Sequence, residues 1–219
     1  MPGEMIMDEI ILAEEITLLD TVIATMSNLI ESRDDLKDPH IKNIRKEVGS
    51  LLAAMDEAGL YQEQRNTWIN NKIVAASQLH DIGKIAISDR ILGKIGRLNP
   101  EEFDTIKQHT TFGVEIIDKI EESLPKAAVS SFNFLQHAKL FAAAHHEKWD
   151  GSGYPAGLSG ANIPLEGRIM AIIDVYDALV SERPYKKAFT RKEAIKIIKD
   201  GKGSHFDPAI VDCFLNAAQ

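Results

Sequence analysis

Residues 73–85 read IVAASQLHDIGKI and place an acid and a base at the end of an apolar helix. Apolar residues between Ile73 and Leu79 recur at helical spacing, which predicts one buried helix face. His80 and Asp81 follow directly, so the same segment carries them into the core. A buried imidazole and a buried carboxylate are costly unless they are paired or bound to a metal ion. We therefore expect this pair to meet partners from other parts of the chain.

Helical patterns continue along the rest of the sequence. Asn99 before Pro100 and Thr190 before Glu193 are helix-start signals, and Gly201 follows the last residue of a helical pattern. No stretch alternates apolar and polar residues long enough to require a sheet. Helices are predicted at about 38–58, 62–82, 100–123, 130–148, 165–183, 190–200 and 208–218. We expect an all-α fold, a single helical bundle of about seven to eight helices with a long N-terminal helix.

The N-terminal helix carries an apolar stripe with heptad-like spacing. We expect residues 1–30 to form this amphipathic helix and residues 31–219 to form the main domain. The stripe can pack on the body of that domain. Alternatively, the helix is a linker that transmits a signal from a partner domain, or a dimerisation helix that pairs with a second chain. The residues of the stripe are Leu12, Ile16, Leu19, Ile23, Met26 and Ile30.

Composition restricts the classes of partner. The 219 residues include 33 Asp and Glu but only 25 Lys and Arg, and the net charge of −8 disfavours general attraction to DNA or to an anionic membrane. No apolar run approaches the roughly 20 residues needed to cross a bilayer. Cys213 is the single cysteine, so a disulfide framework is excluded and a reducing compartment fits. We expect a cytoplasmic protein without DNA binding or membrane insertion.

Histidines and aspartates interrupt several of the predicted apolar helices. One such residue is commonly a satisfied core group, but repeated intrusions indicate a shared site. Imidazole nitrogens and carboxylate oxygens suit iron, manganese, zinc and similar ions, and seven ligands exceed what one ion uses. The sequence therefore predicts two metal ions bridged by an aspartate and a water. The candidate ligands are His40, His80, Asp81, His109, His145, His146 and Asp174.

Two segments carry a resemblance to a known family. LHDIGKI resembles the HD superfamily of metal-dependent phosphohydrolases. Residues 145–186, HHEKWDGSGYPAGLSGANIPLEGRIMAIIDVYDALVSERPYK, are similar to its HD-GYP branch, which hydrolyses cyclic dinucleotides, chiefly cyclic di-GMP, in bacterial signalling. An HD dipeptide alone has little specificity, whereas HHE, DGSGYP, DVYDAL and RPYK in this order are specific as a set. The resemblance runs from about Leu29 to Phe214 and implies that residues 31–219 are an HD-GYP catalytic domain.

The resemblance implies roles for individual residues. It assigns the same seven side chains as metal ligands, with Asp81 as the bridging and catalytic group. Lys84 is implied to act in catalysis and to meet a substrate phosphate as a compact positive charge. Arg183 and Lys186 resemble residues that hold the phosphate or guanine of the substrate. Leu36 stands where many members have a glutamate that supports a third metal, so two divalent ions, Fe or Mn, are expected.

The function that follows is a metal-dependent phosphodiesterase. We expect it to cleave a cyclic dinucleotide, cyclic di-GMP first, to pGpG, GMP or both by a metal-activated hydroxide at a binuclear site. One alternative is a weakly active or inactive HD-GYP module that serves as a cyclic-dinucleotide sensor or protein-docking domain. Another is an HD phosphohydrolase that acts on a different nucleotide, against which the GYP loop and RPYK argue. A sensor or receiver domain, another protein, or a second copy of the chain are the expected protein partners.

Overall fold

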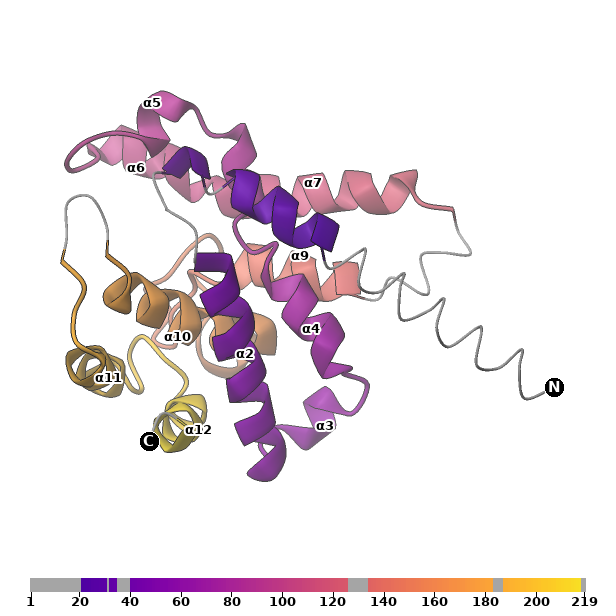
Figure 1. The fold of residues 1–219 in the computed structure, drawn as a ribbon, viewed down its shortest axis with the longest axis vertical. Coiled ribbons are helices and arrows are strands. Elements are labelled where there is room, and N and C mark those ends of the chain that lie inside the picture. The colour runs from indigo at the N-terminus through magenta and orange to yellow at the C-terminus, as the bar shows by residue number, and fades with distance from the viewer. Residues whose placement is uncertain (1–20, 31, 35–39, 126–133, 183–186, 218–219) are drawn as a thin grey trace.

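All regular secondary structure that the computed structural model describes is helical, apart from one isolated bridge (Figure 1). The described residues are 21–30, 32–34, 40–125, 134–182 and 187–217. Within them the one β interaction is an isolated bridge between Lys202 and Phe206. The predicted all-α fold is thus confirmed. None of the helices in the described ranges is both long enough and apolar enough to span a membrane.

The helices of the described residues follow one another along the chain without intervening strands. In chain order they are residues 21–30, the 3-10 helix η1 (Ser32–Asp34), α2 (His40–Glu57), α3 (Gln62–Arg65), α4 (Asn70–Ser77), the 3-10 helix η2 (Ile82–Ala86), α5 (Asp89–Leu92), α6 (Pro100–Lys107), α7 (His109–Ser123), α9 (Phe134–Ala144), the 3-10 helix η4 (Gly160–Asn162), α10 (Leu165–Val180), α11 (Arg191–Asp200) and α12 (Pro208–Ala217). The two predicted helix starts are confirmed, because Asn99 and Thr190 each form a capping box with the glutamate three residues later.

Helices α9 and α10 form the centre of the bundle. Helix α10 packs against α2, α9, α11 and α12, while α4 and α7 pack on α9 (Figure 1). Ile169, Ile172 and Ile173 of α10 are fully buried, and burial of one such side chain stabilises a fold by about 1.5–3 kcal/mol. Polar residues on α10 are therefore held in a rigid setting.

The prediction of one continuous helix over residues 62–82 is wrong, because the structure has two separate helices, α3 and α4, in this range. Its first part, α3, is tied to the end of α2 by the buried guanidinium of Arg65. That group donates to the Leu52 carbonyl at 3.3 Å and to the Asp56 carboxylate at 2.7 Å. Residues 66–69 separate α3 from α4, and the chain turns again after α4 before η2 begins.

The predicted helix over residues 100–123 is also interrupted, between α6 and α7. At this junction Nδ1 of His109 donates to the Ile106 carbonyl at 2.6 Å. A side chain that takes a backbone carbonyl competes with the helical hydrogen-bond pattern. The break therefore coincides with a candidate ligand, and it sets the direction of that imidazole.

The described part of the first helix, residues 21–30, has a buried face and an exposed face. Ile23, Ser27 and Ile30 are buried against the bundle. The sequence placed Met26 in the packing stripe, but Met26 is 41% exposed and Ser27 lies inward instead. The exposed apolar residues are Val22, Met26 and Leu29. Three members of the predicted stripe, Leu12, Ile16 and Leu19, lie outside the described residues.

Candidate metal centre

The structure brings all seven predicted ligand residues together in two groups. One group is Asp81, His109, His145 and His146, and the other is His40, His80 and Asp174. Within each group, one candidate ligand atom per residue lies within 4.8 Å of the others. The residues come from α2, the turn after α4, α7, the end of α9, and α10, so the site depends on the whole bundle.

Gly83 allows the segment with His80 and Asp81 to lie directly on α7. A Cβ atom at Gly83 would stand 1.9 Å from the carbonyl oxygen of His109 and 2.5 Å from the backbone nitrogen of Gly113. No side chain fits there. This close approach places Oδ1 of Asp81 3.2 Å from Nε2 of His109.

A second glycine brings α10 against α9. A Cβ atom at Gly167 would lie 2.6 Å from the Cβ atom of Ala144 and 2.7 Å from its carbonyl oxygen. Ala144 directly precedes His145, so α10 passes beside the histidine pair. Two helical turns further along α10, Asp174 joins the second group.

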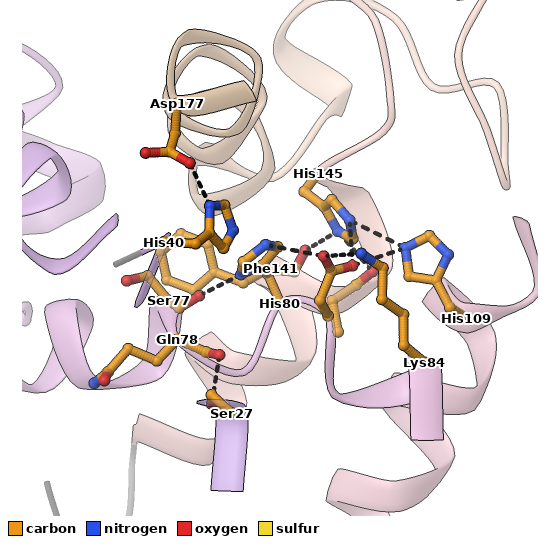
Figure 2. Close-up of polar contacts among 12 residues, drawn as sticks. Ser27, His40, Ser77, Gln78, His80, Lys84, His109, Phe141, His145 and Asp177 are labelled. Atoms are coloured by element: carbon orange, nitrogen blue, oxygen red, sulfur yellow. Dashed lines mark hydrogen bonds and ion pairs between the residues drawn. The ribbon is translucent and has the colours of Figure 1, made fainter. Parts of the chain in front are cut away.

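Backbone carbonyls fix the proton position in three of the imidazoles, and Figure 2 shows two of these contacts, at His80 and His145. Their Nδ1 atoms lie 2.6–2.9 Å from carbonyl oxygens three or four residues earlier in the chain. The pairs are His80 with Ser77, His109 with Ile106, and His145 with Phe141. Because a carbonyl oxygen only accepts, Nδ1 carries the proton, and a neutral ring then keeps a lone pair on Nε2. This arrangement is typical of metal-binding histidines.

A carboxylate orients the fourth imidazole in the same way. Nδ1 of His40 forms a very short hydrogen bond with Oδ2 of Asp177, which is 1% exposed (Figure 2). Asp177 also accepts from Nδ2 of Asn43 at 3.0 Å and from the hydroxyl of Ser181 at 3.2 Å. Sequence reasoning found Asp174 but missed Asp177, three residues later on the same helix. The DVYD spacing was the available signal, because residues three apart share a helix face.

Asp81 lies between the two groups. Its Oδ1 atom is 3.2 Å from Nε2 of His109 and 3.6 Å from Nε2 of His145. Its Oδ2 atom is 3.4 Å from Nε2 of His80 and 2.9 Å from Nζ of Lys84. Burial alone would raise the pKa of Asp81, but the positive charge of Lys84 outweighs it and holds that pKa well below its usual value. An ionised carboxylate thus offers one oxygen to each group.

The donor atoms fit a divalent cation. Nε2 of His109 and Nε2 of His145 are 3.2 Å apart, although both carry lone pairs. Between them, Oδ1 of Asp81 is buried and accepts no hydrogen bond of good geometry. Three electron-pair donors that face one another repel unless a cation lies among them. Two atoms bound to one ion at about 2.0–2.1 Å lie about 2.9–3.4 Å apart, which agrees with the observed spacing.

An aromatic wall leads from this centre to the surface. We use this name for Tyr154 and Phe103 together with Lys107. The centre of the Tyr154 ring lies 4.7 Å from the centre of the His146 ring. Burial lowers the pKa of His146 well below its usual value. Burial and the nearby carboxylates raise the pKa of Tyr154, so its hydroxyl stays protonated. Phe103 is 48% exposed, with Nζ of Lys107 5.2 Å from its ring centre. Sequence reasoning missed Phe103 and Lys107 because neither belongs to a recognisable motif.

The glutamate of HHE holds the loop that carries Tyr154. Glu147 is buried, and its carboxylate accepts from the backbone N–H groups of Ala156 at 2.7 Å and Leu158 at 3.0 Å. A Cβ atom at Gly153 would lie 2.4 Å from a backbone nitrogen of the preceding turn. The loop therefore lies flat on the end of α9, and the position of Tyr154 is fixed.

Three residues singled out from the sequence are not described by the structure. Arg183, Lys186 and Leu36 lie outside the described residues. Their predicted roles, two in substrate binding and one in disfavouring a third ion, stay predictions. The two candidate catalytic residues, Asp81 and Lys84, do lie together.

Comparison with known proteins gives a family and several relatives. A family model described as HD domain matches residues 24–210. A cyclic di-GMP phosphodiesterase of Vibrio cholerae is 42% identical over 91% of this chain and 39% of its own length. A 3'3'-cGAMP-specific phosphodiesterase 2 of the same organism is 38% identical over 89% of this chain and 34% of its own length. The cyclic di-GMP phosphodiesterase response regulator RpfG of Xanthomonas campestris is 38% identical over 88% of this chain and 46% of its own length. The chain thus spans less than half the length of these relatives.

Proposed function

The chain belongs to the HD domain family, in its HD-GYP branch, and from this premise we propose that it is a metal-dependent phosphodiesterase. The proposed substrate is a cyclic dinucleotide, foremost cyclic di-GMP, and the products are pGpG, GMP or both. The observation that supports this most strongly is the ionised Asp81 carboxylate between two groups of imidazole and carboxylate donors. Relatives named as cyclic di-GMP phosphodiesterases support the substrate class.

We propose that each donor group holds one divalent ion. Asp81 is the proposed shared ligand, and the first-row ions Fe and Mn suit the nitrogen and oxygen donors. When bound, such ions supply positive charge for a phosphate and lower the pKa of a coordinated water. Leu36 stands where many family members have a glutamate that supports a third metal, and this favours two ions rather than three.

The side chains around the centre suit a phosphate ester with planar bases. Nζ of Lys84, 2.9 Å from Asp81, provides a compact cation at the site. The protonated hydroxyl of Tyr154 can donate a hydrogen bond, and the exposed ring of Phe103 offers a face on which a guanine base can stack. Arg183 and Lys186 are proposed to hold the phosphate or guanine of the substrate. These groups bring positive charge and aromatic surface to a chain that is acidic overall.

Regulatory partners belong to the same proposal. The exposed apolar face of residues 21–30 is the proposed contact with a second copy or with a sensor or receiver domain. A relative named as a response regulator supports the receiver. Residues 31–219 are the proposed catalytic domain, with the cytoplasm as its proposed location. The second candidate substrate is 3'3'-cGAMP, supported by the relative with that specificity in its name.

Turnover by the metal-loaded protein tests this function. The protein is loaded anaerobically with Fe(II) or Mn(II), its ions are counted, and it is incubated with cyclic di-GMP and with 3'3'-cGAMP. Two ions per chain and conversion to linear products are expected. Intact cyclic dinucleotides in the presence of two ions per chain would contradict the proposal and leave the sensor or docking role.

Substitution of the shared carboxylate tests its position. Asp81→Ala should lower both the metal content and the turnover. The matched control is Asp212→Ala, which removes an exposed carboxylate that pairs only with Lys202 at 2.6 Å among the described contacts. Unchanged metal content and turnover in Asp81→Ala would overturn the bridging role.

A further inference from the structure

We propose that Arg33 is a positioning residue that holds the backbone segment carrying Asp81 and Lys84. Through this contact the 3-10 helix η1, which follows residues 21–30, would set the geometry of the metal centre. The catalytic part of the inference rests on the proposed phosphodiesterase function. The structural part does not.

The guanidinium of Arg33 contacts the end of η2 and the start of α5. Its Nη1 atom donates to the carbonyl oxygens of Lys84 at 3.3 Å and Ile85 at 3.0 Å. Its Nη2 atom donates to the carbonyl oxygen of Ile87 at 2.9 Å, and Nε and Nη2 donate to one carboxylate oxygen of Asp89 at 2.9 and 2.7 Å. A rigid guanidinium with five N–H donors can serve several acceptors at once, which an ammonium group cannot do in the same geometry.

The carbonyl contacts matter more than the ion pair. The side chain of Asp89 is 80% exposed, so its pairing with Arg33 contributes little stability in water. The last carbonyls of a short helix, in contrast, generally lack intrahelical partners, although that of Lys84 also accepts from the Ile87 amide at 3.0 Å. Arg33 supplies those partners to the turn that ends η2.

A contact from the first helix holds the other end of this segment (Figure 2). The buried hydroxyl of Ser27 donates to the carbonyl oxygen of Gln78 at 2.8 Å. Gln78 lies two residues before His80, and Arg33 binds the backbone from Lys84 onwards. Ser27 and Arg33 therefore contact the two ends of the stretch that includes the HD pair.

Position along this segment controls the contacts at the centre. Arg33 holds the main chain of Lys84, whose Nζ atom lies 2.9 Å from Oδ2 of Asp81. On its other side, Gly83 packs on the backbone of α7. A misplacement of about 1 Å in a catalytic group can reduce the rate about 100-fold. Loss of Arg33 would remove the restraint on one side of the segment while the α7 side stays in place.

The test compares Arg33→Gln with Arg33→Lys and a matched control. Arg90→Gln removes the same charge from an exposed position of α5, on the same segment. For each protein we would measure ions per chain, thermal midpoint, kcat and KM. Hydrogen exchange would be followed at the amides of Lys84 and Ile87, which bond to the carbonyls of Asp81 and Lys84.

In Arg33→Gln these two amide hydrogens should exchange with solvent at least tenfold faster than in wild type, and kcat should fall about tenfold. Two ions should still bind, and KM should stay within twofold of the wild-type value. Arg33→Lys should lie between Arg33→Gln and wild type, and Arg90→Gln should match wild type. Unchanged exchange would overturn the proposal, as would a lower thermal midpoint with normal kcat. If Arg33→Gln does not fold, Arg33→Lys decides by the same criteria. Hydrogen exchange needs no substrate, so failure of the phosphodiesterase function would show separately, in the wild type.

Discussion

Replacement of Gly83 by alanine should separate η2 from α7 and open the metal centre. The new Cβ atom would lie 1.9 Å from the His109 carbonyl oxygen and 2.5 Å from the Gly113 nitrogen. Both neighbours are backbone atoms within α7, so neither can rotate away. Ordinary contact at about 3.4 Å or more requires the two segments to move apart by about 1.5 Å.

This movement is large compared with the dimensions of the site. If Asp81 follows η2, the distance from its Oδ1 atom to Nε2 of His109, 3.2 Å in the native protein, grows by a comparable amount. The two atoms would then exceed the roughly 2.9–3.4 Å that ligands of one ion span. We expect binding at least 100-fold weaker at this group. Overpacking typically lowers the free energy of unfolding by about 1–3 kcal/mol. Because the neighbours of Gly83 are rigid backbone atoms, we expect Gly83→Ala to lie at the upper end of this range.

Metal counting after dialysis against a graded chelator, together with urea unfolding of the metal-free protein, measures both effects. The matched control is Gly49→Ala in α2, where the nearest atom to a new Cβ is Cγ2 of Val74 at 3.8 Å. Alanine there should leave metal binding unchanged and raise stability by about 0.5–1 kcal/mol. Wild-type affinity for two ions in Gly83→Ala would refute the claim that backbone contact positions the centre.

Three further predictions concern the surroundings of the site. Asp177→Asn should weaken ion binding about 10- to 100-fold at the group containing His40 and spare the other group, and equal loss at both in a metal titration would contradict this. Phe103→Ala should raise the KM for cyclic di-GMP about fivefold or more with kcat unchanged, because base stacking contributes about 1–3 kcal/mol. Ile197→Ala, which truncates a similarly placed apolar surface residue on α11, is its control, and a loss confined to kcat would argue against stacking. In metal-free protein, the lowered pKa of His146 means that the unfolded chain binds more protons below about pH 6.5, and this group alone should lower stability by about 1 kcal/mol between pH 6.5 and 5.5, with His145 and His205 acting in the same direction. Urea unfolding at both pH values measures this change, and constant stability would contradict it.

The candidate ligands were predictable from sequence because each lies in, or at the end of, a predicted helix with an apolar face. His80 and Asp81 illustrate this, since a pair of ionisable groups beside Leu79 is costly in a core unless it binds a partner or an ion. Their distribution into two groups was not predictable, because it depends on how η2, α7 and α10 approach one another. The close approaches at Gly83 and Gly167 are contacts between segments far apart in the chain, and a glycine in a sequence does not say which backbone it will meet.

The same reasoning explains the residues that sequence reasoning missed. Asp177 looks like one more acid on a helix until its partner His40, 137 positions away, is known. Phe103 is an ordinary apolar residue of a capped helix, and its place beside Tyr154 follows from the break between α6 and α7. Arg33 belongs to no recognisable sequence motif. Its contacts depend on the path of the chain after the first helix.

The two donor groups share one peptide unit, because His80 belongs to one group and Asp81 to the other. Successive Cα atoms across a trans peptide are about 3.8 Å apart and cannot be stretched. The backbone of His80 therefore cannot move without the backbone of Asp81. An input signal that moves this segment would shift both halves in step, so the centre should switch as one unit rather than lose one ion at a time.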